Sequence, residues 1–319
     1  MNGQRVRRER KLILCLALLS AAVYGALLGL RVLQSERGAE ERAYAAQVRL
    51  PDSPAVVEMV NTEESYVLTR GNGGWVCQGN EELKINSVLI SYMSVTLKEL
   101  SPRRVLPDSQ AYLKEFGLTE PAAELTLRMS EGSRTYRVGR YNPVLDEYYM
   151  TVDGGDCVFL IGREDMDLID RTLLELIAGP GFVGTDIGSV TGIHVVRNGE
   201  EYTAERTGDR FRIRWGDREF ERSEYAVSGV YSVFNSAPYA CCRHDADEAA
   251  LAACGLDEPE ISVEFTTSGG DVFLLEVGTD GEGTFHVREN RGGTIYRLSP
   301  EYGALIRERV DPAWLDAPE

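Results

Sequence analysis

The sequence FGLTEP at residues 116–121 returns as CGLDEP at residues 254–259, and the organisation of the whole chain follows from this recurrence. A proline ends both stretches, and proline bars a continuing helix because it lacks a backbone N–H and clashes with the preceding turn. Each stretch therefore predicts a short helix that stops at a turn. A Val-Gly pair follows in both places, at residues 138–139 and 277–278.

Further matches lie in the same order on both sides of these turns. Segments 66–70 and 202–206 are 136 positions apart, and segments 155–161 and 292–298 are 137 positions apart. Self-similarity at a nearly fixed offset is the signature of an internal repeat, and the offset changes only where glycine, asparagine or aspartate predicts a turn. The chain is therefore expected to contain two tandem copies of one unit.

The two copies predict the same secondary structure. Each starts with three strand-like runs, continues with an amphipathic helix and the turn described above, and ends with four strands and a closing helix. The predicted strands are 56–60, 65–70, 74–78, 123–129, 133–138, 147–152 and 156–161, then 193–197, 201–206, 210–215, 260–267, 271–277, 283–288 and 293–298. Runs of strands separated by few helices predict the α+β class with antiparallel sheets.

The amphipathic helices have apolar positions at i, i+3, i+4 and i+7, with one polar exception. These positions are Ile90, Met93, Ser94 and Leu97 in the first copy and Val227, Val230, Tyr231 and Phe234 in the second. The closing helices are predicted to begin near Arg163 and Pro300. A glycine-rich connector at residues 179–192 marks the boundary between the copies.

The N-terminus predicts a membrane anchor. Residues 12–30 carry no charge, and at ~1.5 Å per helical residue they match the ~30 Å hydrocarbon core. Residues 1–11 hold five basic side chains and one acidic one, which predicts a cytoplasmic N-terminus and an extracytoplasmic body. A signal peptide cleaved near residues 20–22 is the alternative, but the apolar residues 23–30 that follow favour an uncleaved anchor.

These patterns predict the domain organisation of the chain. The predicted parts are a basic cytoplasmic tail at 1–11, a transmembrane helix at 12–33, a charged stalk at 34–54, a first repeat unit at 55–180, a second repeat unit at 190–310 and a tail at 311–319. The formal net charge is −17, so the residues after the +4 basic tail sum to −21. An acidic body repels phosphate backbones, and no nucleic-acid partner is expected.

Five cysteines lie beyond the apolar segment: Cys77, Cys157, Cys241, Cys242 and Cys254. Their odd number and irregular spacing do not predict a disulfide framework. Because Cys77 and Cys254 align with Ile213 and Phe116 of the other copy, cysteine is interpreted as a small buried side chain. The adjacent Cys241 and Cys242 near His244 leave a metal or redox site open, although they offer too few spaced ligands.

No pattern of catalytic residues is visible. Catalysis by an activated nucleophile needs a base and an orienting group at one point, which the spacing of His194, His244 and His286 does not predict. The sequence contains no nucleophile-elbow motif, no phosphate-binding loop motif and no dinucleotide-binding fingerprint. Segment GTDGEG at 278–283 lacks the distal glutamate of a calcium loop and predicts a hairpin turn. The sequence thus predicts no catalytic, cofactor-binding or metal-binding residue.

The succession of features resembles a known bacterial family. An anchor precedes Tyr66-x-Leu68-x-Arg70, an amphipathic helix, the Gly-Leu-x-x-Pro turn and Val-Gly, and this order is similar to the family called domain of unknown function 4340 over residues 56–310. The resemblance implies a membrane-anchored protein encoded near ABC-transporter permeases and gliding-motility-type accessory proteins. It carries over no catalytic residues. Trp215-Gly216 and Cys241-Cys242 depart from the usual pattern.

The expected function is a non-enzymatic, membrane-anchored, extracytoplasmic accessory or interaction protein of an ABC-type envelope transport system. Its expected partners are the membrane, through one helix, and other envelope proteins such as a permease. The alternative is a module that binds cell-wall glycan or an exported polymer through Tyr141, Tyr148 and Tyr149, since aromatic rings stack on sugars. An unrecognised hydrolase is the third possibility.

Overall fold

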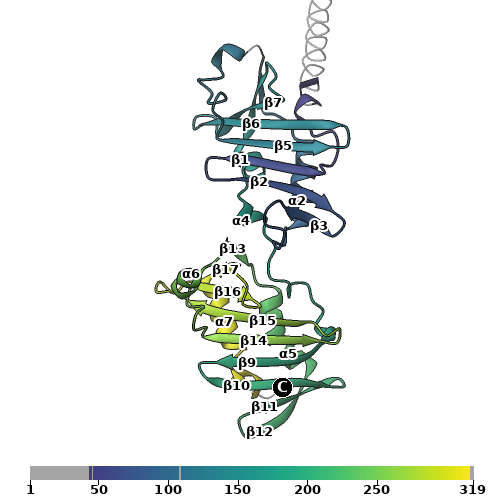
Figure 1. Ribbon diagram of the computed structural model, residues 1–319, viewed down its shortest axis with the longest axis vertical. Helices are drawn as coiled ribbons and strands as arrows, with labels where there is room; N and C mark the ends of the chain where they lie inside the picture. The colour runs from purple at the N-terminus through teal and green to yellow at the C-terminus, as the bar shows by residue number, and fades with distance from the viewer. Residues whose placement is uncertain (1–42, 45, 108, 317–319) are drawn as a thin grey trace, which may run out of the picture. The chain divides into compact units, whose positions relative to one another are not determined.

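The computed structural model describes residues 43–44, 46–107 and 109–316, and it is a mixed α/β fold with two large antiparallel sheets (Figure 1). Of the described residues, those up to 67 and those at 91–170 form one compact unit, and those at 68–90 and from 171 onward form the other. Below, the first and the second unit denote the parts of the chain that form the first and the second sheet. The predicted transmembrane helix, the basic tail and residues 34–42 of the stalk lie outside the described residues. Within the described part, no helix is both long enough and apolar enough to cross a membrane.

The first sheet has eight strands in the order β3-β2-β1-β5-β6-β7-β8-β4. Its strands are β1 Val56–Asn61, β2 Ser65–Gly71, β3 Gly74–Cys77, β4 Arg104–Leu106, β5 Ala123–Met129, β6 Gly132–Asn142, β7 Glu147–Val152 and β8 Val158–Gly162. Helix α2 is Ser87–Glu99, and the shorter elements are η1 Gln110–Tyr112, α3 Arg163–Ile169 and α4 Leu173–Leu176. Val48 and Leu50, at the end of the predicted stalk, are buried, and Leu50 donates its N–H to the carbonyl of Leu97.

The second sheet has nine strands in the order β12-β11-β10-β9-β14-β15-β16-β17-β13. Its strands are β9 Val190–Arg197, β10 Glu200–Thr207, β11 Arg210–Trp215, β12 Arg218–Ser223, β13 Ala240–Arg243, β14 Ile261–Thr267, β15 Val272–Thr279, β16 Phe285–Glu289 and β17 Ile295–Leu298. The helical elements are η2 Ile187–Ser189, α5 Glu224–Asn235, α6 Glu248–Ala253, α7 Pro300–Arg309 and α8 Pro312–Asp316. With β12 set aside, the order of equivalent strands is the same in both sheets.

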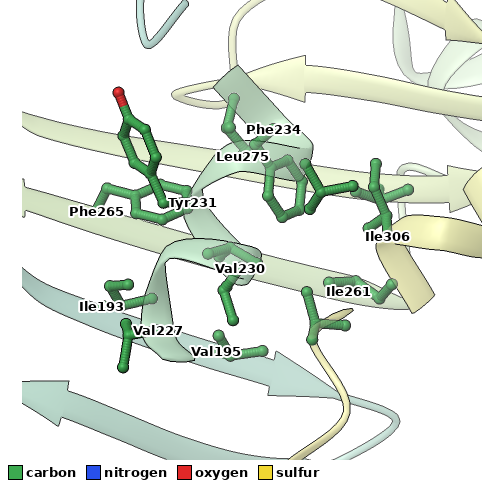
Figure 2. Packing of buried hydrophobic residues seen from close by; sticks show 14 of the residues in the cluster. Ile193, Val195, Val227, Val230, Tyr231, Phe234, Ile261, Phe265, Leu275 and Ile306 are labelled. Carbon is green, nitrogen blue, oxygen red and sulfur yellow. The ribbon is translucent and has the colours of Figure 1, made fainter. Parts of the chain in front are cut away.

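Helix α5 closes the core of the second unit. Its apolar residues point onto β9, β14 and β15, where they meet side chains of alternating strand positions and Ile306 of α7 (Figure 2). The helix starts at Ser223, whose side chain accepts a hydrogen bond from the N–H of Ala226. The predicted positions Val227, Val230, Tyr231 and Phe234 are all buried. Buried residues recur about every 3.6 positions in the helix and every second position in the strands, as expected where a helix packs on a sheet.

The Val-Gly pairs have a shared structural reason. A side chain at Gly139 would collide with the carbonyl oxygen of Phe116, and a side chain at Gly278 would collide with that of Gly255. In each sheet the Gly-Leu-x-x-Pro turn thus lies directly against a strand backbone at a position that only glycine leaves open. The two motifs recur together in the sequence because each turn packs on its own glycine.

Three strands were not expected from the sequence: β4, β12 and β13. All three are edge strands, and β4 and β13 have only three and four residues. Strand β12 reads REFERS and is rich in charge, which is typical of edge strands because charge discourages pairing with other chains. Trp215-Gly216, which departs from the pattern of the family that the sequence resembles, leads from β11 into β12. Gly216 has a φ of +54° in this turn, a conformation that glycine adopts without strain.

Candidate interaction surface

One side of helix α2 is apolar and buried. The side chain of Asn86 accepts a hydrogen bond from the N–H of Leu89 at 3.1 Å and so caps the start of the helix. Ile90, Met93 and Leu97 are buried, as the sequence predicted. Burial in the core therefore accounts for this side of α2.

The opposite side of α2 exposes three apolar residues beside the exposed Ser87 and Ser91. Val88, Tyr92 and Val95 are 78%, 58% and 54% exposed, and we call these three residues the α2 stripe. They stand at i, i+4 and i+7, so their side chains lie in one row along the helix. No charged residue occurs from Ser87 to Leu97, although 27% of the chain is charged. A solvated helix normally carries charge along its outer face, and on α2 such charge is confined to the last turn, at Lys98 and Glu99.

The equivalent helix of the second unit is α5, and its outer face can be compared with the α2 stripe. The buried positions of the two helices correspond at an offset of 137 residues, which places Tyr225, Gly229 and Ser232 where α2 has the stripe. On α5 this face borders α7 and α8. The ring of Trp314 from α8 lies so close to Gly229 that a side chain there would collide with it. Tyr302 of α7 donates its hydroxyl to the carbonyl of Ser236 at 3.1 Å.

In the second unit the outer helix face is thus partly covered by the chain's own C-terminal helices. In the first unit the closing helix α3 contacts β7 and β8. The stripe remains open to solvent in the part of the chain that the structure describes. Sequence reasoning found the buried side of α2 and missed this one, although the run of eleven residues without a charge, 87–97, was the available signal.

The histidines are not brought together. His194 on β9 lies 3.4 Å from a carboxylate oxygen of Glu201, on the exposed side of the sheet. His286 on β16 is buried, and this burial lowers its pKa in spite of the nearby Asp280. Strands β14 and β15 lie between β9 and β16, which separates the strands of the two histidines by roughly 14 Å at ~4.8 Å per strand. His244 follows β13 at the far edge of the sheet.

The cysteines match their predicted burial only in part. Cys77 is buried, whereas the other four cysteines are half-buried: Cys157, Cys241, Cys242 and Cys254. Burial raises the pKa of Cys241 to about 11 and also raises that of Cys242. Few thiolates then exist at neutral pH, and thiolates are the form that binds metals and attacks disulfides. The described residues contain no group of three or more His, Cys, Asp or Glu placed to hold a metal.

The three tyrosines proposed for glycan binding do not share one surface. Tyr141 and Tyr148 are cross-strand neighbours with ring centres 5.0 Å apart. Tyr149 points to the other face, where it stacks on Phe116 at 4.3 Å. Successive strand residues alternate between faces, so adjacent tyrosines cannot act together. The loop at 278–283 is a hairpin turn between β15 and β16, in which the carboxylate of Asp280 accepts the N–H groups of Glu282 and Thr284.

A hollow of about 320 Å³ lies beside the β9–β10 turn and the start of α8. Arg197 and Asp311 line it and pair at 2.7 Å. Tyr202 also lines it, but its hydroxyl is sealed from solvent. The ion pair fastens the C-terminal segment to the sheet, and this explains the arrangement without a ligand.

Comparisons with known proteins agree with the resemblance noted in the sequence. A search of curated proteins finds no match to the chain. A family model matches residues 75–228, which run from β3 through α2 and the first sheet into α5. The model is that of the family described as Domain of unknown function (DUF4340), and the match supports the resemblance over these residues.

Proposed function

We propose that this protein is a non-enzymatic, membrane-anchored, extracytoplasmic accessory protein that binds an envelope partner through the α2 stripe. The partner class is an integral protein such as the permease of an ABC-type transport system. The observation that carries the proposal is the stripe itself: Val88, Tyr92 and Val95 expose a row of apolar surface along residues 87–97 of α2, which carry no charge. Burying such surface yields ~25 cal/mol per Å², so an exposed apolar row favours association.

The proposal includes the N-terminal anchor at residues 12–33 and an origin of the body by duplication. The uncharged run at 12–30 and the basic flank at 1–11 support the anchor and its orientation. The common strand order of the two sheets supports the duplication. An acidic, membrane-anchored body with an exposed apolar row is suited to binding a partner protein rather than to catalysis.

The absence of enzyme activity is part of the same proposal. Its support is that His194 and His286 stand on separate strands and that burial raises the pKa values of Cys241 and Cys242. A nucleophile and its base must lie within hydrogen-bond reach, and these candidates do not form such a pair.

The substitution Tyr92→Glu tests the proposed function. A carboxylate in the middle of the stripe must be desolvated on binding, which costs several kcal/mol and removes the partner. The measurement is copurification of membrane proteins with the full chain from solubilised membranes, quantified by mass spectrometry. The matched control is Tyr225→Glu, because Tyr225 is 88% exposed and introduces the same charge on the equivalent helix.

We expect the partner to be lost with Tyr92→Glu and kept with Tyr225→Glu. Equal recovery of the same membrane proteins from all three chains would contradict the role of the stripe. Recovery of no membrane protein even with the unchanged chain would contradict the accessory function altogether.

A second candidate function is glycan binding by Tyr141 and Tyr148. This pair is favoured by one observation: the two rings lie side by side at the β6–β7 turn, where Tyr141 is 38% exposed and donates its hydroxyl to Asp146. Titration with cell-wall fragments should change tyrosine fluorescence in the unchanged chain and not in Tyr141→Ala. Unchanged fluorescence in both chains would exclude this function.

A further inference from the structure

The side-chain sizes of the α2 stripe and the charge of the neighbouring Glu99 indicate which kind of element binds there. We propose that its occupant is an amphipathic helix of a partner protein, which presents small side chains opposite Tyr92 and a basic residue opposite Glu99. This inference rests on the proposed function, because it names the kind of element that the stripe binds.

The second unit contains an internal example of the contact. The face of α5 equivalent to the stripe is met by helices, α7 and α8, and not by a strand or loop. A large side chain of the cover, Trp314, fills the space above the smallest residue of α5, Gly229. Helices pack in this way when ridges of one fill grooves of the other, at interaxial distances of ~8–10 Å.

The sizes are reversed on α2. Tyr92 stands where α5 has Gly229, and Val95 stands where α5 has Ser232. On α2 the large side chain is Tyr92 itself, so the covering helix must carry small residues opposite it. A helix with glycine, alanine or serine at two positions one turn apart offers such a groove, whereas a second large side chain there would hold the two helices apart.

The charge at the end of the stripe gives the polarity of the partner. Glu99 follows Val95 by one helical turn on the same side and is exposed. The neighbouring Lys98 donates to the hydroxyl of Ser53 at 2.9 Å, so its ammonium is directed away from the stripe. A basic residue at one end of the covering helix would pair with Glu99 while the uncharged run 87–97 meets apolar side chains.

A second copy of this chain is the less suitable occupant. In a two-fold pair Tyr92 would face another Tyr92 rather than a small residue. Two chains of net charge −17 also repel each other, and the stripe has no basic residue for Glu99.

Site-specific photo-crosslinking tests the inference in the host membrane. The full chain carries p-benzoylphenylalanine in place of Tyr92, and a matched chain carries it in place of Tyr225, which is exposed on the equivalent helix. Both positions are exposed, and unchanged circular dichroism verifies that each chain folds. After irradiation, the crosslinked residues of the partner are mapped by mass spectrometry.

We expect crosslinks from position 92 to fall on partner residues three or four apart in one segment that contains small residues, with loss of the product when Val88→Glu is added. Crosslinks to alternate residues of an extended segment, or to a second copy of this chain, would overturn the helical partner and leave the proposed interaction standing. The same low yield from positions 92 and 225 would overturn the proposed function as well.

Discussion

At the scale of single residues, two glycines explain the most recognisable repeated motif of the sequence. Gly139 and Gly278 lie under the carbonyl oxygens of Phe116 and Gly255, and no larger residue fits unless the backbone moves. The sequence showed that the turns and the Val-Gly pairs recur together. It could not show why, because the contact joins segments more than twenty residues apart and depends on the distance between two backbones.

The substitution Gly278→Ala should lower the free energy of unfolding by about 3 kcal/mol, since an overpacked position against a backbone atom cannot relax by rotating a side chain. Urea unfolding followed by circular dichroism measures this. Gly281→Ala is the matched control: it lies in the adjacent hairpin, and nothing stands within 4 Å of the position of its added methyl group. Equal midpoints for the two variants would show that the turn does not depend on the glycine.

His286 predicts a pH dependence of stability. Burial holds its pKa below the ordinary value, so the unfolded chain takes up a proton at a higher pH than the folded chain does. Below the unfolded pKa of ~6.5 the unfolded state therefore gains protons first, and stability falls as the pH is lowered from 7 to 5. The variant His286→Gln should flatten the plot of unfolding free energy against pH in this window. An unchanged slope would mean that other groups cause it.

At the scale of elements, α8 is the cover that α2 lacks. Arg309 lies over the ring of Trp314 at 4.7 Å, and this ring fills the space above Gly229. The variant Trp314→Ala should cost about 2 kcal/mol of stability, because a half-buried indole is removed and the outer face of α5 opens. It should also increase binding of a hydrophobic fluorescent dye. Tyr225→Ala removes an exposed ring and should change neither quantity, and an equal response of both variants would contradict the covering role.

The sequence predicted the central strands and the edge strand β3, and it missed the three other edge strands. Long strands such as β5 and β14 alternate between apolar and polar residues because one face is buried, and this alternation is visible without a structure. The edge strands β4, β12 and β13 are short or charged and leave no such pattern. The α2 stripe was missed for a different reason: apolar residues all round a helix are read as core unless burial is known.

At the scale of the whole molecule, the two units share a strand order but differ in one respect that bears on function. The second unit covers the outer face of its main helix with α7 and α8, and the first leaves the equivalent face apolar and open. If one copy of a duplicated unit keeps an uncovered apolar face, the cover is expected from another molecule.

The most direct test is oxidative footprinting of Tyr92, performed once on intact cells and once on the purified full chain. Tyr92 is 58% exposed and should be oxidised readily in the purified chain. In cells the partner should protect Tyr92, while Tyr225, which is 88% exposed on the equivalent helix, should be oxidised to the same extent in both samples. Equal oxidation of Tyr92 in cells and in the purified chain would contradict the claim that the α2 stripe is a docking surface.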